Sequence, residues 1–488
     1  MESWYPSAKM GGRNNEERLP FKLWVAAGAI EAGLLAYSQL VAYFGNESFH
    51  LLASQLINRG KRPYLDFFYQ HVPLYIYLNA AWMRVFGEGW PSAHVLSALL
   101  AGGCALLVGD YTFARLGLTR RRLASATMAA LLVGLNFYVV CFGTVGLPFG
   151  LCLFLIAASF RLTTESVNRR GWVTAFFAGV CAGAAAASSL LSAPVAVVLL
   201  LWMICYTRAG NRLKKCAAFL AGASIPFLPL IWLFAQDPRK TFFNIVEYHL
   251  FYRVETTESA LRWNLREIIE WFASYQGLVL VPLAATGLWF AKRRGEFDAR
   301  QKSELYLCAW LIAVLSVYLS LPRPTFAFYF VLLTPFAGIL AAVGFYAIGE
   351  RVRGLKSAWV ALALVALYAS GLAGRMYKSR LEILYADHKA IETAAGVINQ
   401  VTPRDGLVYA FEQVYFEAKR LPPPGLENGF NPFSPGDEWL AEGRFDTVCM
   451  MANDPRIKSL DLFDRYAKSE AIDTRNFTLY VFWDRVAR

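Results

Sequence analysis

The chain contains 488 residues, of which 56% are hydrophobic and only 17% are charged. Soluble globular proteins carry about a quarter charged residues, so this composition argues against a soluble globular protein. The formal net charge of +12 is divided among short loops between apolar stretches. That distribution argues against a nucleic-acid partner, which would need a contiguous basic surface.

Apolar stretches long enough to cross a membrane recur along the chain. A helix of roughly 20 apolar residues crosses the hydrocarbon layer and satisfies its own backbone hydrogen bonds there. The first stretch lacks a small-residue cleavage site and follows a polar tail, so we expect it to be retained rather than cleaved as a signal peptide. The pattern predicts about eleven spans, near residues 22–44, 93–115, 123–143, 145–163, 172–188, 193–207, 216–235, 276–291, 304–321, 325–348 and 357–374.

Basic residues gather before the first span and in every second connection after it. The positive-inside rule therefore predicts that the tail 1–21 and these connections face the cytoplasm. An odd number of spans then places residues 375–488 on the other side. In a bacterial inner membrane that side is the periplasm, so we expect a transmembrane domain over 22–374 and a periplasmic domain over 375–488.

Two connections on the predicted outer side, 45–91 and 236–275, are too long to be turns, and long loops of this kind are usually functional. In the first long loop, apolar residues at helical spacing over Phe49–Ile57 predict an amphipathic helix suited to the membrane interface. Pro73 is placed to start a second helix, Leu74–Phe86.

Polar and charged residues become frequent after residue 374. Helices alternate with strands in this part, which predicts a small α/β domain. The patterns indicate helices near 387–400, 412–420, 434–442 and 455–468, and strands at Leu407–Phe411, Phe445–Met450 and Phe477–Trp483.

The outer loops hold residues that suit sugar transfer from a lipid phosphate. Glu47 and Asp66 are acids able to take a proton from an acceptor hydroxyl, unless Glu47 only favours a helix N-terminus and Asp66 only bonds a turn. His71 and His249 also lie in the long outer loops, and we predict that they help to bind the donor phosphate. Cations on this side suit the departing phosphate; they are Arg59, Lys61, Arg62, Arg253, Arg262, Arg266 and Arg323.

The first long loop resembles that of GT-C glycosyltransferases, in the bacterial branch similar to protein O-mannosyltransferases and the aminoarabinose transferases of lipid A. The likeness rests on the run from Asn46 to Gly60, on Pro63-Tyr64-Leu65-Asp66-Phe67, on Pro73-Leu74-Tyr75 and on Phe86-Gly87. A later run, Arg323-Pro324 with Tyr329 and Pro335, resembles the family's late helix. The resemblance implies a polyprenyl-phosphate sugar donor, an inverting mechanism and, in some members, a divalent cation.

Two positions depart from the family pattern. The family's catalytic Asp would fall on Asn46, whose amide cannot act as a base, and a metal-binding Glu of the lipid A branch would fall near Gln70. We therefore predict Glu47 and Asp66 as the base or substrate positioner, and we assign no metal ligand. The residues predicted to bind donor and phosphate are Asn46, Arg62, Tyr64, His71, His249 and Arg323.

The sequence thus predicts a glycosyltransferase that moves a hexosyl or pentosyl group from a polyprenyl-phosphate carrier to a lipid, glycan or protein acceptor at the outer face of the inner membrane. The alternative is a relative that binds or flips lipid-linked sugars without transferring them. A transporter tends to carry ionisable residues within its spans, whereas the predicted spans hold few charges besides Glu31 and Asp110.

Overall fold

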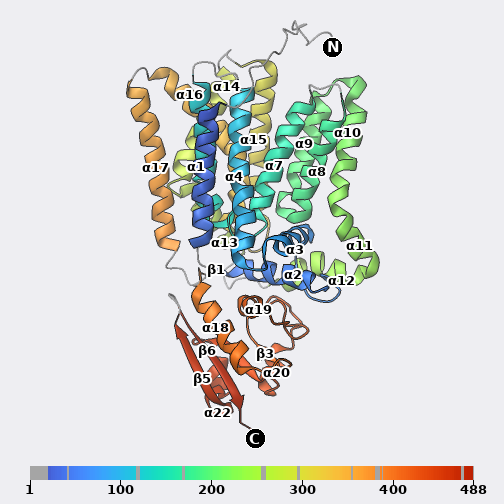
Figure 1. Ribbon diagram of the computed structural model, residues 1–488. Coiled ribbons are helices and arrows are strands. Elements are labelled where there is room, and N and C mark those ends of the chain that lie inside the picture. The colour runs from blue at the N-terminus through green and yellow to red at the C-terminus, as the bar shows by residue number, and fades with distance from the viewer. Residues whose placement is uncertain are drawn as a thin grey trace.

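The computed structural model describes residues 20–40, 43–116, 121–167, 171–253, 260–293, 297–352, 355–379, 385–386, 388–473 and 477–486. Within these ranges a bundle of long helices carries a smaller α/β part at one end (Figure 1). The tail predicted over 1–21 lies outside the described residues up to residue 19.

The bundle part consists of long helices and several shorter helical segments. The helices in this part are α1 (Phe21–Leu40), α4 (Trp90–Arg115), α5 (Arg122–Gly134), α6 (Phe137–Phe142), α7 (Phe149–Ser166), α8 (Val173–Ser188), α9 (Ala193–Tyr206), α10 (Ala209–Ser224), α11 (Leu228–Gln236), α12 (Pro238–Phe242), the π-helix Phe243–Tyr252, α13 (Ala260–Ala273), α14 (Gly277–Arg293), α15 (Ala299–Leu319), the 3-10 helix Ala327–Leu333, α16 (Thr334–Arg351) and α17 (Leu355–Ser379).

The helices match the predicted spans in position. Among the described residues, seven helical segments are long and apolar enough to cross a membrane, and the bent pair α13–α14, with 75° between its halves, adds an eighth. Shorter apolar helices cover the remaining predicted ranges. The range 123–143 is broken because the Asn136 side chain accepts a hydrogen bond from Tyr138 N at 3.0 Å and starts α6 afresh.

Close helix contacts use small residues. Gly287 of α14 and Gly344 of α16 face each other's helices, and a Cβ on either would overlap the carbonyl oxygen of Leu340 or Leu283. Helices in apolar surroundings gain packing energy from this close approach.

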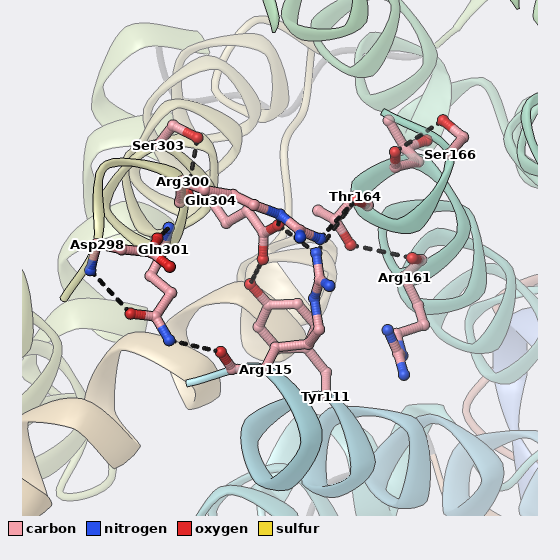
Figure 2. A network of polar contacts seen from close by, with 11 residues as sticks. Tyr111, Arg115, Arg161, Thr164, Ser166, Asp298, Arg300, Gln301, Ser303 and Glu304 are labelled. Carbon is pink, nitrogen blue, oxygen red and sulfur yellow. Dashed lines mark hydrogen bonds and ion pairs between the residues drawn. The ribbon is translucent and has the colours of Figure 1, made fainter. Parts of the chain in front are cut away.

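A polar network joins α4, α7 and α15 (Figure 2). The buried Glu304 carboxylate accepts hydrogen bonds from Arg115 (2.5 Å), Arg300 (3.1 Å) and the Tyr111 hydroxyl (2.8 Å). Arg115 also donates to the Thr164 carbonyl at 3.2 Å. A buried carboxylate is tolerated only with such partners, so we interpret this network as structural.

The first long loop folds into the 3-10 helix Gly45–Glu47, α2 (Ser48–Asn58) and α3 (Leu74–Phe86). The bounds predicted for α3 are confirmed. Helix α2 is amphipathic in sequence, but the protein covers its polar side as well. Gln55 donates to the Phe416 carbonyl at 3.0 Å and to the Glu88 carboxylate at 2.8 Å. The expected interfacial helix is therefore an internal element between the bundle and the C-terminal part.

The C-terminal part is a sheet covered by helices. Its strands run in the order β3-β4-β6-β5, with β3 parallel to β4 and the other pairs antiparallel. Its elements are α18 (His388–Val401), β3 (Val408–Tyr409), α19 (Glu412–Ala418), α20 (Gly436–Ala441), β4 (Thr447–Met451), α21 (Arg456–Ser459), α22 (Leu462–Arg465), β5 (Tyr466–Asp473) and β6 (Thr478–Arg485). A separate antiparallel pair joins β1 (Tyr43–Phe44) to β2 (Tyr385–Ala386).

The helix predicted over 455–468 is two short helices, α21 and α22, and the prediction is wrong at its last three residues. Residues from Tyr466 onward form β5, which pairs with β6 at Tyr466–Arg485 and continuously from Lys468–Trp483 to Asp473–Thr478. Strand pairing of this kind overrides local helix propensity. Helix α17 also continues past the predicted end at residue 374, to Ser379.

Candidate active site

A cavity of about 320 Å³ opens where the two long loops meet the ends of α8 and α15. Apolar residues such as Phe149, Leu190 and Phe328 form part of its wall. Among the described residues that line it, none is Asp or Glu. Its polar lining consists of Asn46, His50, Gln70, His71, Ser188, Ser189, His249, Arg253, Tyr318, Arg323 and Tyr329.

Three histidines stand in a row along one wall. The ring centroids of His50 and His71 lie 5.4 Å apart, and those of His71 and His249 lie 6.0 Å apart. Burial lowers the pKa of His50 to about 3, and it holds the pKa of His71 and of His249 below the ordinary value as well. All three rings are therefore neutral near pH 7.

The tautomer of His249 follows from its partner. Its Nε2 lies 2.6 Å from the Gln70 carbonyl oxygen, which can only accept a hydrogen bond, so Nε2 carries the hydrogen. The other ring nitrogen, Nδ1, then keeps its lone pair as a hydrogen-bond acceptor. The His50 Nδ1 atom lies 2.8 Å from the Tyr69 hydroxyl.

Two guanidinium groups, those of Arg253 and Arg323, also line the cavity. Arg253 donates to the Pro324 carbonyl at 3.3 Å and to the Tyr329 hydroxyl at 3.2 Å. Among the described residues, both side-chain hydrogen bonds printed for Arg253 go to neutral oxygen atoms rather than to a carboxylate. Guanidinium groups suit a phosphate, which they bind through charge-assisted hydrogen bonds.

Glu47 lies behind the cavity wall and is fully buried, at 0% exposure. Its carboxylate accepts hydrogen bonds from His94 Nε2 at 2.8 Å and from Gly146 N at 2.7 Å. Since His94 Nδ1 lies 2.7 Å from the Ser38 carbonyl, both ring nitrogens face acceptors and the ring is an imidazolium. Burial opposes ionisation of Glu47, but the charge and hydrogen bond of His94 outweigh it and lower the pKa of Glu47.

Asp66 closes a turn of the first long loop. Its carboxylate accepts hydrogen bonds from Arg62 N (2.8 Å), Nε (3.0 Å) and Nη2 (3.1 Å), and the bond to Arg62 lowers the pKa of Asp66. Within the same turn, Tyr64 has a φ of 67° and donates its hydroxyl hydrogen to the His71 carbonyl at 2.6 Å. These contacts fix the turn that carries His71.

The structure thus brings Asn46, His71, His249 and Arg323 to one cavity, and it leaves four other candidates outside the lining: Glu47, Arg62, Tyr64 and Asp66. The sequence prediction missed His50 as a lining residue and did not select Arg253 from the outer cations. It also missed His94, which pairs with Glu47. A histidine within a predicted span is itself a signal, because ionisable residues in spans are usually paired or functional.

The donor set does not fit a divalent cation. Among the described residues, no group of three His, Cys, Asp or Glu side chains is placed to hold a metal ion. Gln70, at the position of the implied metal-binding Glu, uses its side-chain oxygen to accept a hydrogen bond from Asn428 at 2.8 Å.

Solved structures match this arrangement of helices and sheet. ArnT from Cupriavidus metallidurans, bound to undecaprenyl phosphate, aligns with a TM-score of 0.65 and 14% identity over 95% of this chain and 98% of ArnT. This chain has the GT-C glycosyltransferase fold. It is a polytopic helical membrane protein with a small C-terminal α/β part, as the sequence pattern predicts.

Two further GT-C structures support the same conclusion about the fold. The archaeal oligosaccharyltransferase AglB from Archaeoglobus fulgidus has a TM-score of 0.54 and 13% identity over 90% of this chain and 70% of AglB. The arabinosyltransferase EmbB from Mycobacterium smegmatis has a TM-score of 0.53 and 14% identity over 77% of this chain and 40% of EmbB. No family model matches the chain, and no curated protein matches its sequence.

Proposed function

We propose that the protein transfers a sugar from a polyprenyl-phosphate carrier to an acceptor hydroxyl at the outer face of the bacterial inner membrane. The observation that carries the proposal is the cavity lined by Arg253 and Arg323, neutral histidines and apolar side chains. A phosphate with a prenyl chain needs both kinds of lining. The fold is shared with ArnT, whose structure holds undecaprenyl phosphate.

In this proposal the two arginines bind the donor phosphate and stabilise it as it leaves. The acceptor oxygen attacks the anomeric carbon on the face opposite the phosphate, so the carbon–oxygen bond to the phosphate breaks with inversion. The acceptor proton passes to an imidazole nitrogen. We assign this role to Nδ1 of His249, because its Nε2 hydrogen is committed to the Gln70 carbonyl and no carboxylate lines the described cavity wall.

Glu47 and Asp66 act as positioning residues in this scheme. Glu47 holds the turn at Gly146, and the next residues of that turn, Leu147 and Pro148, line the cavity. Asp66 fixes the turn before His71. Asn46 faces the cavity, where its amide can orient a sugar hydroxyl by donating or accepting a hydrogen bond.

The test is a transfer assay with the purified full chain in nanodiscs and labelled undecaprenyl-phosphate-linked hexoses and pentoses. We expect release of undecaprenyl phosphate by the wild type and a loss of at least about 100-fold in Arg253→Gln/Arg323→Gln, in line with the loss of phosphate stabilisation in other enzymes. Arg59→Gln is the matched control, since this exposed arginine pairs with Glu88 and lies outside the cavity lining.

The competing hypothesis is transport without transfer. This hypothesis predicts that the protein in liposomes moves the labelled lipid across the bilayer and releases no undecaprenyl phosphate. That result, or full turnover in the double arginine variant, would refute the proposed transferase site.

A further inference from the structure

A second and larger cavity, of about 660 Å³, lies within the C-terminal part. Its floor is formed where the parallel strands β3 and β4 end, at Tyr409–Glu412 and Cys449–Met451. Ligands of open α/β sheets bind outside the carboxyl ends of parallel strands. The loop between α19 and α20 and the segment Asn453–Arg456 complete the walls.

Acidic side chains outnumber basic side chains in the lining of this cavity. Glu412, Asp437 and Asp454 line it together with one cation, Arg456. Arg456 is fully engaged, since it donates to Asp454 at 2.7 Å, to Asp437 at 2.5 Å and to the Tyr409 hydroxyl at 2.8 Å. The carboxylates therefore exceed the cation, so the cavity disfavours a phosphate or another anion.

The remaining polar groups offer hydrogen bonds to hydroxyl groups. Glu412 accepts a hydrogen bond from Gly429 N at 2.7 Å, and burial raises the pKa of its carboxyl group. A carboxyl group has several lone pairs, so it can also accept a hydrogen bond from a ligand hydroxyl. Asp437 is 81% exposed along its side chain and uses only one oxygen for Arg456. Asn453 stands exposed at the rim. Phe411 and Tyr409 add aromatic surface.

A single layer of side chains separates the two cavities. Asn428 lines the second cavity and Gln70 lines the first, and the Asn428 amide donates to the Gln70 side-chain oxygen at 2.8 Å. Nearby, the ring of Phe430 meets the ring of Phe49 edge-on at a centroid distance of 5.9 Å. A ligand in the second cavity therefore lies directly beside the cavity to which we assign the donor phosphate.

We propose that the second cavity binds a neutral, polyhydroxylated glycan that forms part of the acceptor. The inference rests on the proposed function, because it names the substrate class of the same transfer. The carboxylates accept hydrogen bonds from vicinal hydroxyls, the aromatic rings cover a sugar face, and the acidic balance rejects phosphorylated sugars. The first cavity is lined by arginines and therefore favours the anionic donor. The second cavity is lined mainly by acids and therefore favours a neutral acceptor.

The test uses saturation-transfer NMR on the full chain in nanodiscs. The probes are neutral trisaccharides of glucose, mannose and N-acetylglucosamine, with glucose 6-phosphate and inorganic phosphate as charged counterparts. We expect at least one neutral trisaccharide to receive saturation and glucose 6-phosphate to receive none. Glu412→Gln/Asp437→Asn removes two charge-assisted hydrogen bonds and is expected to weaken binding about 10-fold.

Two more variants keep the result interpretable. Asn453→Trp is expected to block the cavity from its exposed rim and abolish binding. Glu470→Gln is the matched control, because Glu470 is an exposed acid of β5 outside the cavity, and it is expected to bind as the wild type does. Each variant is checked for an unchanged melting temperature.

The inference is overturned if the wild type saturates none of the neutral trisaccharides, if glucose 6-phosphate binds as well as they do, or if Glu470→Gln loses as much binding as the double variant. Failure of the proposed function gives a different result: glycan binding persists while Arg253→Gln/Arg323→Gln keeps full turnover. Turnover that depends on the arginines, without glycan binding, overturns only the second cavity.

Discussion

Glu47 is a predicted catalytic residue that the structure places outside the cavity lining. The carboxylate is buried between the His94 imidazolium of α4 and the backbone amide of Gly146 in the turn before α7. His94 in turn contacts the Ser38 carbonyl of α1. One buried ion pair therefore connects three parts of the bundle. A buried ion pair is costly to break, because either partner alone becomes an uncompensated charge.

Replacement of Glu47 by Leu is therefore expected to destabilise the protein by about 3–5 kcal/mol, seen as a lowered melting temperature in nanodiscs. The double variant Glu47→Leu/His94→Leu is expected to regain part of this loss, since it removes both charges and keeps apolar volume. Asp66→Asn, at a half-exposed pair, serves as the control and is expected to cost less than about 1 kcal/mol. A Glu47→Leu protein that melts like the wild type contradicts the interpretation.

The pH dependence of stability is a second residue-scale prediction. Burial lowers the pKa of His50 to about 3, below the ordinary value of 6.5, so the unfolded chain binds a proton that the folded chain rejects. The contribution of His50 is therefore fully present above pH 6.5 and falls by about 1.4 kcal/mol for each pH unit below it.

We expect the melting temperature to drop between pH 7 and pH 5, and less steeply in His50→Gln, which has no titrating group. Thermal melting at several pH values measures both slopes. Equal slopes in the two proteins would show that His50 is solvated or protonated in the folded state.

At the scale of elements, the helix ranges could be read from hydropathy, since each predicted span coincides with apolar helix. The helix break at Asn136 could not be predicted from hydropathy, because it depends on a side-chain cap. The strand β5 could not be predicted either, because it depends on pairing with β6. The sequence pattern predicts helix α2, but it does not predict that the polar side of α2 is buried. That burial depends on Phe416, which lies far away in the sequence.

The contact between α14 and α16 gives the element-scale prediction. Gly344→Leu places a side chain against the Leu283 carbonyl, so the helices must separate, and we expect a cost of at least about 1–3 kcal/mol. Gly28→Leu on α1 is the matched control, because a Cβ at Gly28 meets no atom within 4 Å. Melting temperature and folded yield distinguish the two variants; equal losses would contradict close packing at Gly344.

At the scale of the molecule, the bundle and the C-terminal part share one apolar cluster. Leu51 and Leu52 of α2 belong to the same cluster as Ile391 of α18 and Phe416 of α19, and the Trp90 ring stacks on the His388 ring at a centroid distance of 3.6 Å. The α/β part is therefore attached through its own core residues, next to both cavities.

Phe416→Asp tests this attachment, since Phe416 is 0% exposed and a carboxylate there loses several kcal/mol of solvation. We expect limited proteolysis to release the C-terminal part faster than in the wild type. Phe463→Asp is the control, because Phe463 is 54% exposed on the same part of the chain. Equal proteolysis of both variants would show that the cluster does not hold the two parts together.

The sequence by itself determined the membrane class, the helix ranges and the first-loop motif, because spans and helix starts depend on residues close together in the chain. Which candidate side chains meet was decided only by the tertiary structure. Asn46, His71, His249 and Arg323 share a cavity, whereas Glu47 turns away from it toward His94. The physical reason is that a buried charge goes where its counter-charge lies, and its counter-charge lies on another helix.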